Sequence, residues 1–248
     1  MIGKPSLKSA FLSTFENGLE PYGFKRLKGT VFFGKLVNDE ILLHVSYDKC
    51  GSVMPGKKAF RIMAGASTIY SYDLSNSLLL HSHEPSILAY DNDSITVDMS
   101  YHYDNSSVIE AVETSLNDTI KAGIPVLSNI NDLRSYVDFT AKFMTCFLYN
   151  ADKFYQDSVA LILSDNHDDF SEIRERSKKS LLNAFNGDSS NPYYQSSLQN
   201  ENSIFDNELI AARDKVYADP KLMEGVKKEA ASRKEKNLQT LRSYGLLD

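Results

Sequence analysis

The sequence lacks the features that define several classes of protein. It holds two cysteines, Cys50 and Cys146, and two isolated cysteines do not make the framework of a small disulfide-bonded domain. No stretch reaches the roughly 18 uninterrupted apolar residues that a membrane-spanning helix needs. The first residues, from Met1 to Lys8, contain no long apolar run, which argues against a secretory signal. We therefore predict a soluble, cytoplasmic protein whose thiols stay reduced.

An excess of positive charge is also missing. Lysine and arginine number 27 against 33 aspartates and glutamates, which gives a net charge of -6. Because phosphate groups attract proteins through lysine and arginine, we expect neither a nucleic-acid partner nor a membrane partner. One basic run, at residues 25–28, lies beside Phe24, Phe32 and Phe33. We interpret these rings as core residues and expect Phe24 and either Phe32 or Phe33 to be buried.

The sequence motifs of common enzymes are absent as well. There is no Gly-x-Ser-x-Gly elbow, no P-loop and no Gly-x-Gly-x-x-Gly fingerprint. Neither cysteine lies in a catalytic signature, and the sequence has no internal repeat. The sequence therefore predicts no cofactor and favours a protein that is not an enzyme.

The patterns that are present change period near residue 105. Apolar residues recur every fourth position over 7–19, which predicts an amphipathic helix that Gly18 weakens and Pro21 ends. Alternating residues then indicate strands of a sheet with one covered and one solvated face. Asn38 and Asp39 are a candidate turn between the first two strands. The predicted strands cover residues 30–37, 40–47, 60–65 and 94–103.

A helical period follows these strands. Ser107 and Glu110 fit a capping box at the start of a helix that Gly123 and Pro125 close. The polar segment 186–202 is typical of a surface loop or linker. Further helices are predicted near residues 133–144, 155–162, 173–185, 204–218 and 221–242.

Strands followed by helices predict an α+β fold. We expect an antiparallel sheet of about four to six strands covered by helices, followed by a helical C-terminal half. The predicted domains are a sheet domain over 1–125 and a helical region over 126–248, with the polar linker near 186–202.

The corner between the first helix and the first strand carries a family resemblance. Residues 23–33 read Gly-Phe-Lys-Arg-Leu-Lys-Gly-Thr-Val-Phe-Phe. This segment resembles the Gly-Phe-Lys-Arg turn and aromatic strand of the uncharacterised DUF4304 family, and the resemblance covers at most about the first seventy residues. Here Gly34 and Lys35 stand where that family has an aromatic residue and arginine. The resemblance implies a small α+β domain in a bacterial cytoplasmic protein, and it brings no catalytic residues with it.

Histidines close together form the most metal-like cluster in the sequence. His81, His83 and Glu84 lie within four residues, and the two histidines point to the same side of an extended segment. Zinc usually takes three or four protein ligands, so His44, His102 or Asp98 would have to complete the site. The alternative is a surface loop that binds no metal.

Polar residues on the predicted solvated face of the sheet form a second candidate site. We name His44, Arg61, Asp98 and His102 as candidate binding residues on that face. Asp98 and His102 lie four residues apart on one strand, which separates their Cα atoms by about 13 Å, too far for direct contact. The alternative is a hydrated sheet face that binds nothing.

Three kinds of function remain open on these patterns. We favour a non-enzymatic cytoplasmic protein that binds another protein, and an immunity- or antitoxin-like role, in which its negative charge meets a basic partner, is one form of this hypothesis. The second is a metal-dependent or general acid-base hydrolase that uses His81, His83 and Glu84, or Asp98 and His102. The third is a structural module in which the helical half forms a homodimer. Fold class alone does not choose among them.

Overall fold

The chain forms two compact units. Unit 1 consists of Met1–Ile69, Asp73–Asn131 and Asn237–Asp248, and unit 2 consists of Tyr70–Tyr72 and Asp132–Lys236. The computed structural model describes residues 5–70, 90–91, 94–95, 100–136, 139, 162–164, 178–179, 181–183, 185–203 and 211–247. The predicted α+β class is confirmed. The division differs from the predicted one, because the last twelve residues, expected in the helical half, belong to the sheet-bearing unit 1.

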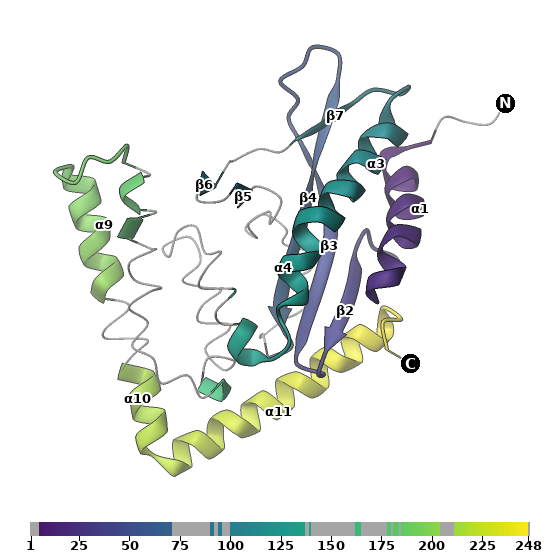
Figure 1. Cartoon of the computed structure of the whole chain (residues 1–248). Coiled ribbons are helices and arrows are strands. Elements are labelled where there is room, and N and C mark those ends of the chain that lie inside the picture. The colour runs from purple at the N-terminus through teal and green to yellow at the C-terminus, as the bar shows by residue number, and fades with distance from the viewer. Residues whose placement is uncertain are drawn as a thin grey trace. The chain divides into compact units, whose positions relative to one another are not determined.

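Unit 1 is built on a five-stranded antiparallel sheet with the order β1-β2-β3-β4-β7 (Figure 1). Its strands are β1 (Lys25–Arg26), β2 (Phe33–Val37), β3 (Ile41–Cys50), β4 (Lys58–Thr68) and β7 (Tyr101–Tyr103). The long hairpin of β3 and β4 pairs continuously from Ile41 with Thr68 to Cys50 with Ala59. Both strands extend further toward their connecting loop than the sequence predicted.

The hairpin of β2 and β3 confirms the predicted turn. Asn38 and Asp39 take positive φ angles of 50° and 54°, a conformation that asparagine and aspartate tolerate better than most residues. The amide of Asn38 also donates a hydrogen bond of 2.7 Å to the carbonyl oxygen of Asn131. This contact ties the turn to the end of the helical segment that follows the sheet.

The predicted strand over 94–103 is wrong as a single element. Its start forms β6 (Ser94–Ile95), which pairs with β5 (Tyr90–Asp91) in a separate two-stranded ladder. Its end forms β7, which pairs with the first residues of β4. Alternation of side chains reports the two-residue period of extended backbone but does not say which strand is the neighbour.

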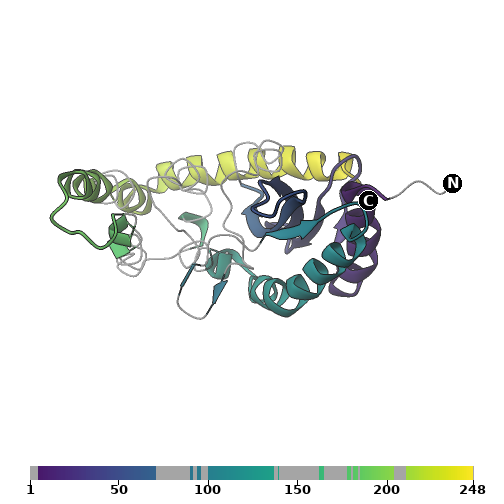
Figure 2. The same cartoon turned by 90° about the horizontal axis from the view of Figure 1, so that it is seen from above.

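Two helices cover the first face of the five-stranded sheet, which carries Ile41, Leu43, Val45 and Tyr47. These are α1 (Leu7–Leu19) and α3 (Val108–Asp118), which lie on the same side of the sheet (Figure 2). The ring of Phe11 on α1 lies 4.7 Å from the ring of Tyr47 and 5.8 Å from that of Phe33. The apolar stripe predicted over 7–19 is therefore the buried face of α1.

The end of the chain covers the second face, which carries Leu42, His44 and Ser46. Leu241 and Leu246 join Leu42 in one buried cluster together with Leu27, Phe32 and Ile69. The prediction of a solvated face is wrong at His44 and Ser46, which are 3% and 0% exposed. The returning C-terminus covers Leu42 on this face, and the ring of His44 packs against that of Phe32, contacts that local alternation does not report.

Leu241 lies in the last turn of helix α11 (Pro220–Ser243), and Leu246 lies just after the end of this helix. Gly245 has a φ of 71°, and its N–H donates to the carbonyl of Arg242 while the N–H of Leu246 donates to that of Leu241. These two bonds form a Schellman motif, which ends the helix and turns Leu246 back toward Leu241. Residues of α11 up to Lys236 belong to unit 2 and those from Asn237 belong to unit 1.

The turn between α1 and the first strands buries the aromatic side chains that were predicted to be buried there. A short 3₁₀ turn, η1 (Glu20–Tyr22), ends at Gly23, whose φ of 81° allows the chain to reverse into β1. Phe24 is 5% exposed, Phe32 is 3% exposed and Phe33 is 0% exposed. The expectation that Phe24 and one of the two other rings are buried is confirmed.

The start and end of α3 differ from the predicted pattern. Ser107 makes no side-chain cap; instead the carboxylate of Asp104 accepts hydrogen bonds from the backbone N–H groups of Ser106 and Ser107. Gly123 and Pro125 do not close the helix. A π-helical turn, η4 (Thr119–Gly123), leads directly into α4 (Ile124–Ser128), and Pro125 lies in the first turn of α4, next to this change in helical hydrogen bonding.

The described part of unit 2 is helical. It contains α9 (Pro192–Ser203), α10 (Ala211–Ala218) and the first part of α11. The predicted loop over 186–202 is wrong from Pro192 onward, because proline starts α9 and Tyr194 buries its ring against Phe185 at 6.0 Å.

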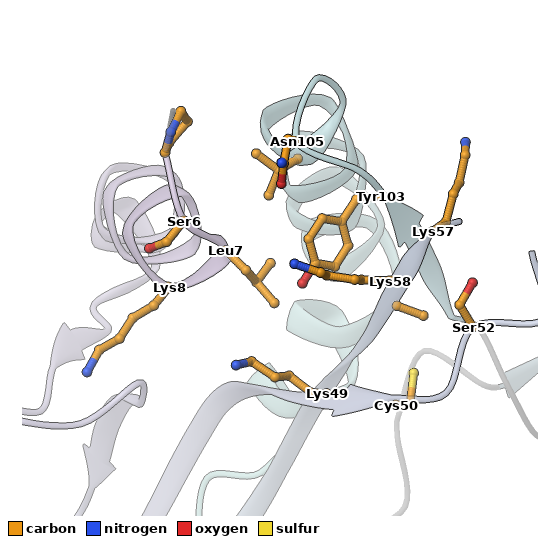
Figure 3. Close-up of a pocket in the computed structure, with 13 residues that line it drawn as sticks. Ser6, Leu7, Lys8, Lys49, Cys50, Ser52, Lys57, Lys58, Tyr103 and Asn105 are labelled. Carbon is orange, nitrogen blue, oxygen red and sulfur yellow. The ribbon is translucent and has the colours of Figure 1, made fainter. Parts of the chain in front are cut away.

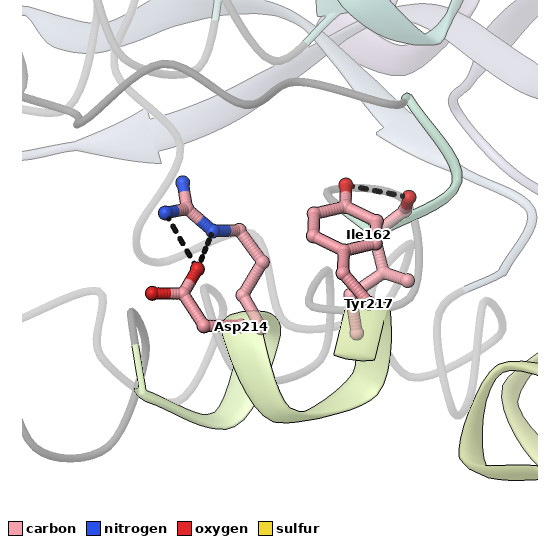
Figure 4. A network of polar contacts seen from close by, with 4 residues as sticks. Ile162, Asp214 and Tyr217 are labelled. Atoms are coloured by element: carbon pink, nitrogen blue, oxygen red, sulfur yellow. Dashed lines mark hydrogen bonds and ion pairs between the residues drawn. The ribbon is translucent and has the colours of Figure 1, made fainter. Parts of the chain in front are cut away.

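Helix α10 is held by polar contacts (Figure 4). The buried guanidinium of Arg213 donates two hydrogen bonds of 2.9 Å to one carboxylate oxygen of Asp214. The hydroxyl of Tyr217 donates to the carbonyl of Ile162 at 3.0 Å. In the described ranges, none of the helices is both long and apolar enough to cross a bilayer.

Candidate binding site

Three of the four candidate binding residues lie on the second face of the sheet, where His44 lies apart from Arg61 and His102. The register pairs His44 with Gly65, Arg61 with Asp48, and His102 with Ala59. His44 and Asp48 are four residues apart on β3, so His44 and Arg61 are separated by about 13 Å along the strands. Asp98 lies outside the described residues.

Each of the three has a structural environment of its own. The buried ring of His44 packs 6.2 Å from the ring of Phe32, and its Nε2 lies 3.4 Å from Ser67 Oγ. The half-exposed guanidinium of Arg61 donates to the carboxylate of Asp48 at 3.1 Å. His44 is therefore a core residue and Arg61 a member of a cross-strand ion pair.

The predicted metal cluster of His81, His83 and Glu84 lies outside the described residues. Within the described ranges, no three histidine, cysteine or acidic side chains are placed to hold a metal ion. His44 and His102, named as further ligands, lie on strands β3 and β7, which are separated by β4. These two histidines do not approach each other to form part of one site.

A pocket of about 740 Å³ opens in unit 1 at the end of the sheet where β3 and β4 connect (Figure 3). The start of α1, the β3–β4 connection and the start of α3 surround it. The residues that line it are Pro5, Ser6, Leu7, Lys8, Lys49, Cys50, Ser52, Lys57, Lys58, Ala59, Tyr103, Asn105 and Val108. Its floor is apolar and buried, and its rim is cationic. We call it the lysine pocket.

Four lysines form the rim: Lys8, Lys49, Lys57 and Lys58. None of the described residues that line the pocket is acidic, and none of the four ammonium groups forms an ion pair or hydrogen bond within the described part of the chain. Figure 3 shows the side chains of Lys49 and Lys58 reaching toward the start of α1, where Leu7 lies. The pocket therefore concentrates uncompensated positive charge on a chain whose net charge is -6.

The sheet places Lys49 and Lys58 on its first face, just beyond the aromatic core. Lys49 pairs with Phe60, and Lys58 pairs with Tyr103. The ring of Phe60 packs 5.8 Å from that of Tyr103, and burial raises the pKa of the Tyr103 hydroxyl above its ordinary value. Two like charges on diagonal positions of neighbouring strands repel each other, so this arrangement contributes nothing to the stability of the sheet.

Lys8 adds a third charge from the first turn of α1. The side chain of Ser6 caps that helix by accepting a hydrogen bond of 3.1 Å from the N–H of Ser9. The first turn contains no acidic residue, although the positive end of a helix dipole favours acidic residues and disfavours lysine. The placement of Lys8 thus opposes the local preference, as residues at binding sites commonly do.

The acidic residue Asp104, which precedes the pocket residue Asn105, forms hydrogen bonds outside the pocket. Asp104 accepts hydrogen bonds from the side chain and backbone of Ser106 and from Ser107, and these bonds lower its pKa to about 2. Its charge is used to hold the turn that precedes α3. It does not line the pocket, where Asn105 stands instead.

The loop between β3 and β4 is fastened beside the pocket. Ser52 Oγ lies 2.9 Å from His102 Nδ1 and accepts a hydrogen bond of 3.1 Å from the N–H of Met54. Cys50 Sγ lies 3.4 Å from Ser100 Oγ. These contacts fix the loop to β7 and to Ser100, the residue before it. They also give His102 a partner that the sequence did not suggest.

Sequence reasoning missed the lysine pocket. The predicted strands ended at Tyr47 and began again at Phe60, which left Lys49 and Lys58 in a loop. A signal was present, because Lys49 continues the alternation of Val45 and Tyr47 on the covered face. The contribution of Lys8 comes from tertiary packing and has no sequence signal.

Comparison of the whole sequence with models of known families, with curated proteins and with solved structures gives no match, so the resemblance of residues 23–33 to the DUF4304 family stays a prediction.

Proposed function

We propose that this chain is a non-enzymatic binding protein and that the lysine pocket receives an anionic group of its ligand. The observation that supports the proposal is the set of four lysines around one pocket with no acidic residue in its described lining. Clustered ammonium groups without counter-charges repel each other, and a bound anion relieves that repulsion. The buried side chains of Leu7 and Val108 exclude water from one side of the bound group.

The expected affinity for a small anion is modest. All four lysines are exposed, so each contributes roughly 0.2–1 kcal/mol to binding an anion, as in a solvated ion pair. Together they supply about 1–4 kcal/mol, which corresponds to a dissociation constant of about 1 mM or weaker. Tight binding therefore requires a ligand that makes further contacts around the pocket.

A partner protein that presents carboxylates or phosphates fits this requirement. An immunity- or antitoxin-like role is one form of the proposal, with the modification that the lysine pocket meets an acidic part of the partner. The negative remainder of the chain stays available to a basic part of the same partner.

A hydrolase is the second candidate, and one observation favours it. His102 Nδ1 lies 2.9 Å from Ser52 Oγ beside the lysine pocket. A histidine that accepts the proton of a serine hydroxyl is the usual arrangement for activating a nucleophile. Ser52 Oγ also bonds to the backbone of Met54, which is the behaviour of a residue that shapes a turn, so binding is the better-supported function.

An NMR titration of the labelled protein with sodium pyrophosphate at low ionic strength tests the proposal. We expect the backbone signals of Leu7, Lys49 and Lys58 to shift with saturation. The double variant Lys49→Gln/Lys58→Gln should weaken binding by about 10-fold, since two of the four charges are lost. The matched control Lys227→Gln/Lys228→Gln removes the same charge from exposed positions of α11 and should stay within about 2-fold of the wild type. Absence of saturable shifts, or equal weakening by the control, would refute the proposal.

A further inference from the structure

The loop between β3 and β4 presents apolar side chains beside the lysine pocket. Val53 is 88% exposed and Met54 is 46% exposed, and they are adjacent at the tip of this loop. Apolar residues scattered singly over a surface are ordinary, and two adjacent ones at the tip of a fixed loop form a small exposed apolar patch. The same loop supplies Ser52 and Lys57 to the lining of the pocket. The apolar tip and part of the cationic rim therefore belong to the same loop.

This tip is held in place by hydrogen bonds. Ser52 Oγ contacts His102 on β7 at 2.9 Å, and the N–H of Lys57 donates to the carbonyl of Met54 at 3.2 Å. The loop thus closes on itself and is anchored to the sheet. An anchored loop loses little conformational freedom when it binds, so its apolar side chains contribute more of their burial to affinity.

Resting on the proposed function, we infer that the ligand of the lysine pocket is an acidic segment of a partner protein that also carries an apolar or aromatic side chain. The carboxylates of the segment enter the pocket toward Lys49 and Lys58, and the apolar side chain packs on Val53 and Met54. A small phosphate compound would use the lysines but leave the tip exposed. Only a ligand with both chemistries uses the whole surface.

Charge complementarity favours a protein segment over an anionic bilayer. The lysines surround a concave pocket, which admits a discrete acidic side chain better than a flat membrane surface. The chain as a whole carries a net charge of -6, which repels a bilayer of anionic lipids once the molecule approaches it. A short segment meets the local positive field without facing that repulsion.

Binding of defined polymers tests the inference. The probes are fluorescein-labelled poly-glutamate and a random copolymer of glutamate and tyrosine, measured by fluorescence anisotropy. We expect the copolymer to bind the wild type about 10-fold more tightly than poly-glutamate, because tyrosine buries apolar area on the tip. The variant Val53→Ser/Met54→Ser should remove this preference and leave pyrophosphate binding unchanged, since neither side chain lines the pocket. Lys49→Gln/Lys58→Gln should weaken binding of both polymers and of pyrophosphate.

Controls separate this inference from the proposed function and from a membrane. Tyr193→Ser/Leu222→Ser removes exposed apolar side chains in unit 2 and should keep the preference for the copolymer. A copolymer preference that survives Val53→Ser/Met54→Ser overturns the inference while leaving the anion pocket intact. Binding to phosphatidylserine vesicles that depends on Val53 and Met54, without a copolymer preference, also overturns it in favour of a lipid surface. Failure of the wild type to bind pyrophosphate refutes the proposed function itself.

Discussion

Lys58 pairs with Tyr103 across β4 and β7, and this pair marks the place where the aromatic core of unit 1 ends and its cationic rim begins. Tyr103 is 7% exposed, whereas Lys58 is exposed. On the same face Phe60 stacks 5.4 Å from Tyr101, so the sheet is apolar up to its last few residues. The lysine pocket is thus built on a rigid, well-packed base. A rigid base holds the strands that carry Lys49 and Lys58 in fixed register although the two like charges repel each other.

That repulsion predicts an unusual effect on stability. The variant Lys49→Gln/Lys58→Gln should be more stable than the wild type at low ionic strength, by about 0.5 kcal/mol, because two unpaired like charges are removed. The gain should vanish near 1 M salt, where screening already removes the repulsion. Urea unfolding at both salt concentrations measures it.

A control double variant on α11 should change stability in the opposite direction or leave it unchanged. Lys227 and Lys228 lie three and four residues after Glu224, which is a favourable spacing for helical ion pairs. Lys227→Gln/Lys228→Gln should therefore leave stability unchanged or lower it by about 0.5 kcal/mol. If both double variants changed stability in the same direction, local repulsion in the lysine pocket would not be the cause.

Replacement of Gly34 by alanine should disturb the packing on the second face of the sheet. A Cβ at this position would lie 2.8 Å from Leu27 Cδ1 and 3.1 Å from Leu42 Cδ1. Gly34→Ala should destabilise unit 1 by about 1–3 kcal/mol, because a core that is already packed must shift to admit a methyl group. Gly51→Ala is the control, since no atom lies within 4 Å of the Cβ it would add. We expect that change to stay within about 0.5 kcal/mol in urea unfolding. Equal stability of Gly34→Ala and wild type would mean that the leucines move aside freely.

The surroundings of Gly34 show which structural features the sequence predicts and which it does not. The strand around it follows from its β-branched and aromatic residues, and the stripe of Phe11 and Phe15 follows from helical period. Such patterns depend on neighbours within a few residues. The sequence does not reveal that Leu246 packs over Gly34, because the contact joins residues more than 200 positions apart.

The dependence on local patterns also explains why the binding face was predicted in part and the lysine pocket was not predicted. The predicted face of His44, Arg61 and His102 has the right register, since alternation fixes which side chains share a face. Its burial at His44, which packs against Phe32, comes from tertiary contacts that no local pattern reports. The lysine pocket needs the end of one hairpin and the start of α1 in one place, which only the tertiary structure supplies.

The returning C-terminus should be essential to unit 1. Leu246→Ala and Leu241→Ala each remove a buried side chain from the cluster over the second face and should cost about 2–4 kcal/mol. Leu222→Ala, on the partly exposed side of the same helix, should cost less than about 1 kcal/mol. Tyrosine fluorescence during urea unfolding reports these differences, since the sequence has 14 tyrosines and no tryptophan. Small, equal effects in all three variants would show that the sheet is stable without this cover.

Asp104 should give unit 1 part of its resistance to acid. Hydrogen bonds from the Ser106 hydroxyl and N–H, and from Ser107, lower the pKa of Asp104 from 3.8 to about 2 in the folded state. Because the folded protein binds this proton less readily than the unfolded chain, the stabilising contribution is complete above pH 3.8 and is lost as the pH falls through about 2. Asp104→Ala should therefore be less stable than the wild type at pH 5 by urea unfolding, and the gap should close as the pH approaches 2. Asp132 and Asp188, whose pKa values are also lowered, titrate in both proteins and cancel in the comparison. A gap between wild type and Asp104→Ala that stays constant from pH 5 to pH 2 would mean that Asp104 stabilises the turn before α3 through its shape and not through its charge.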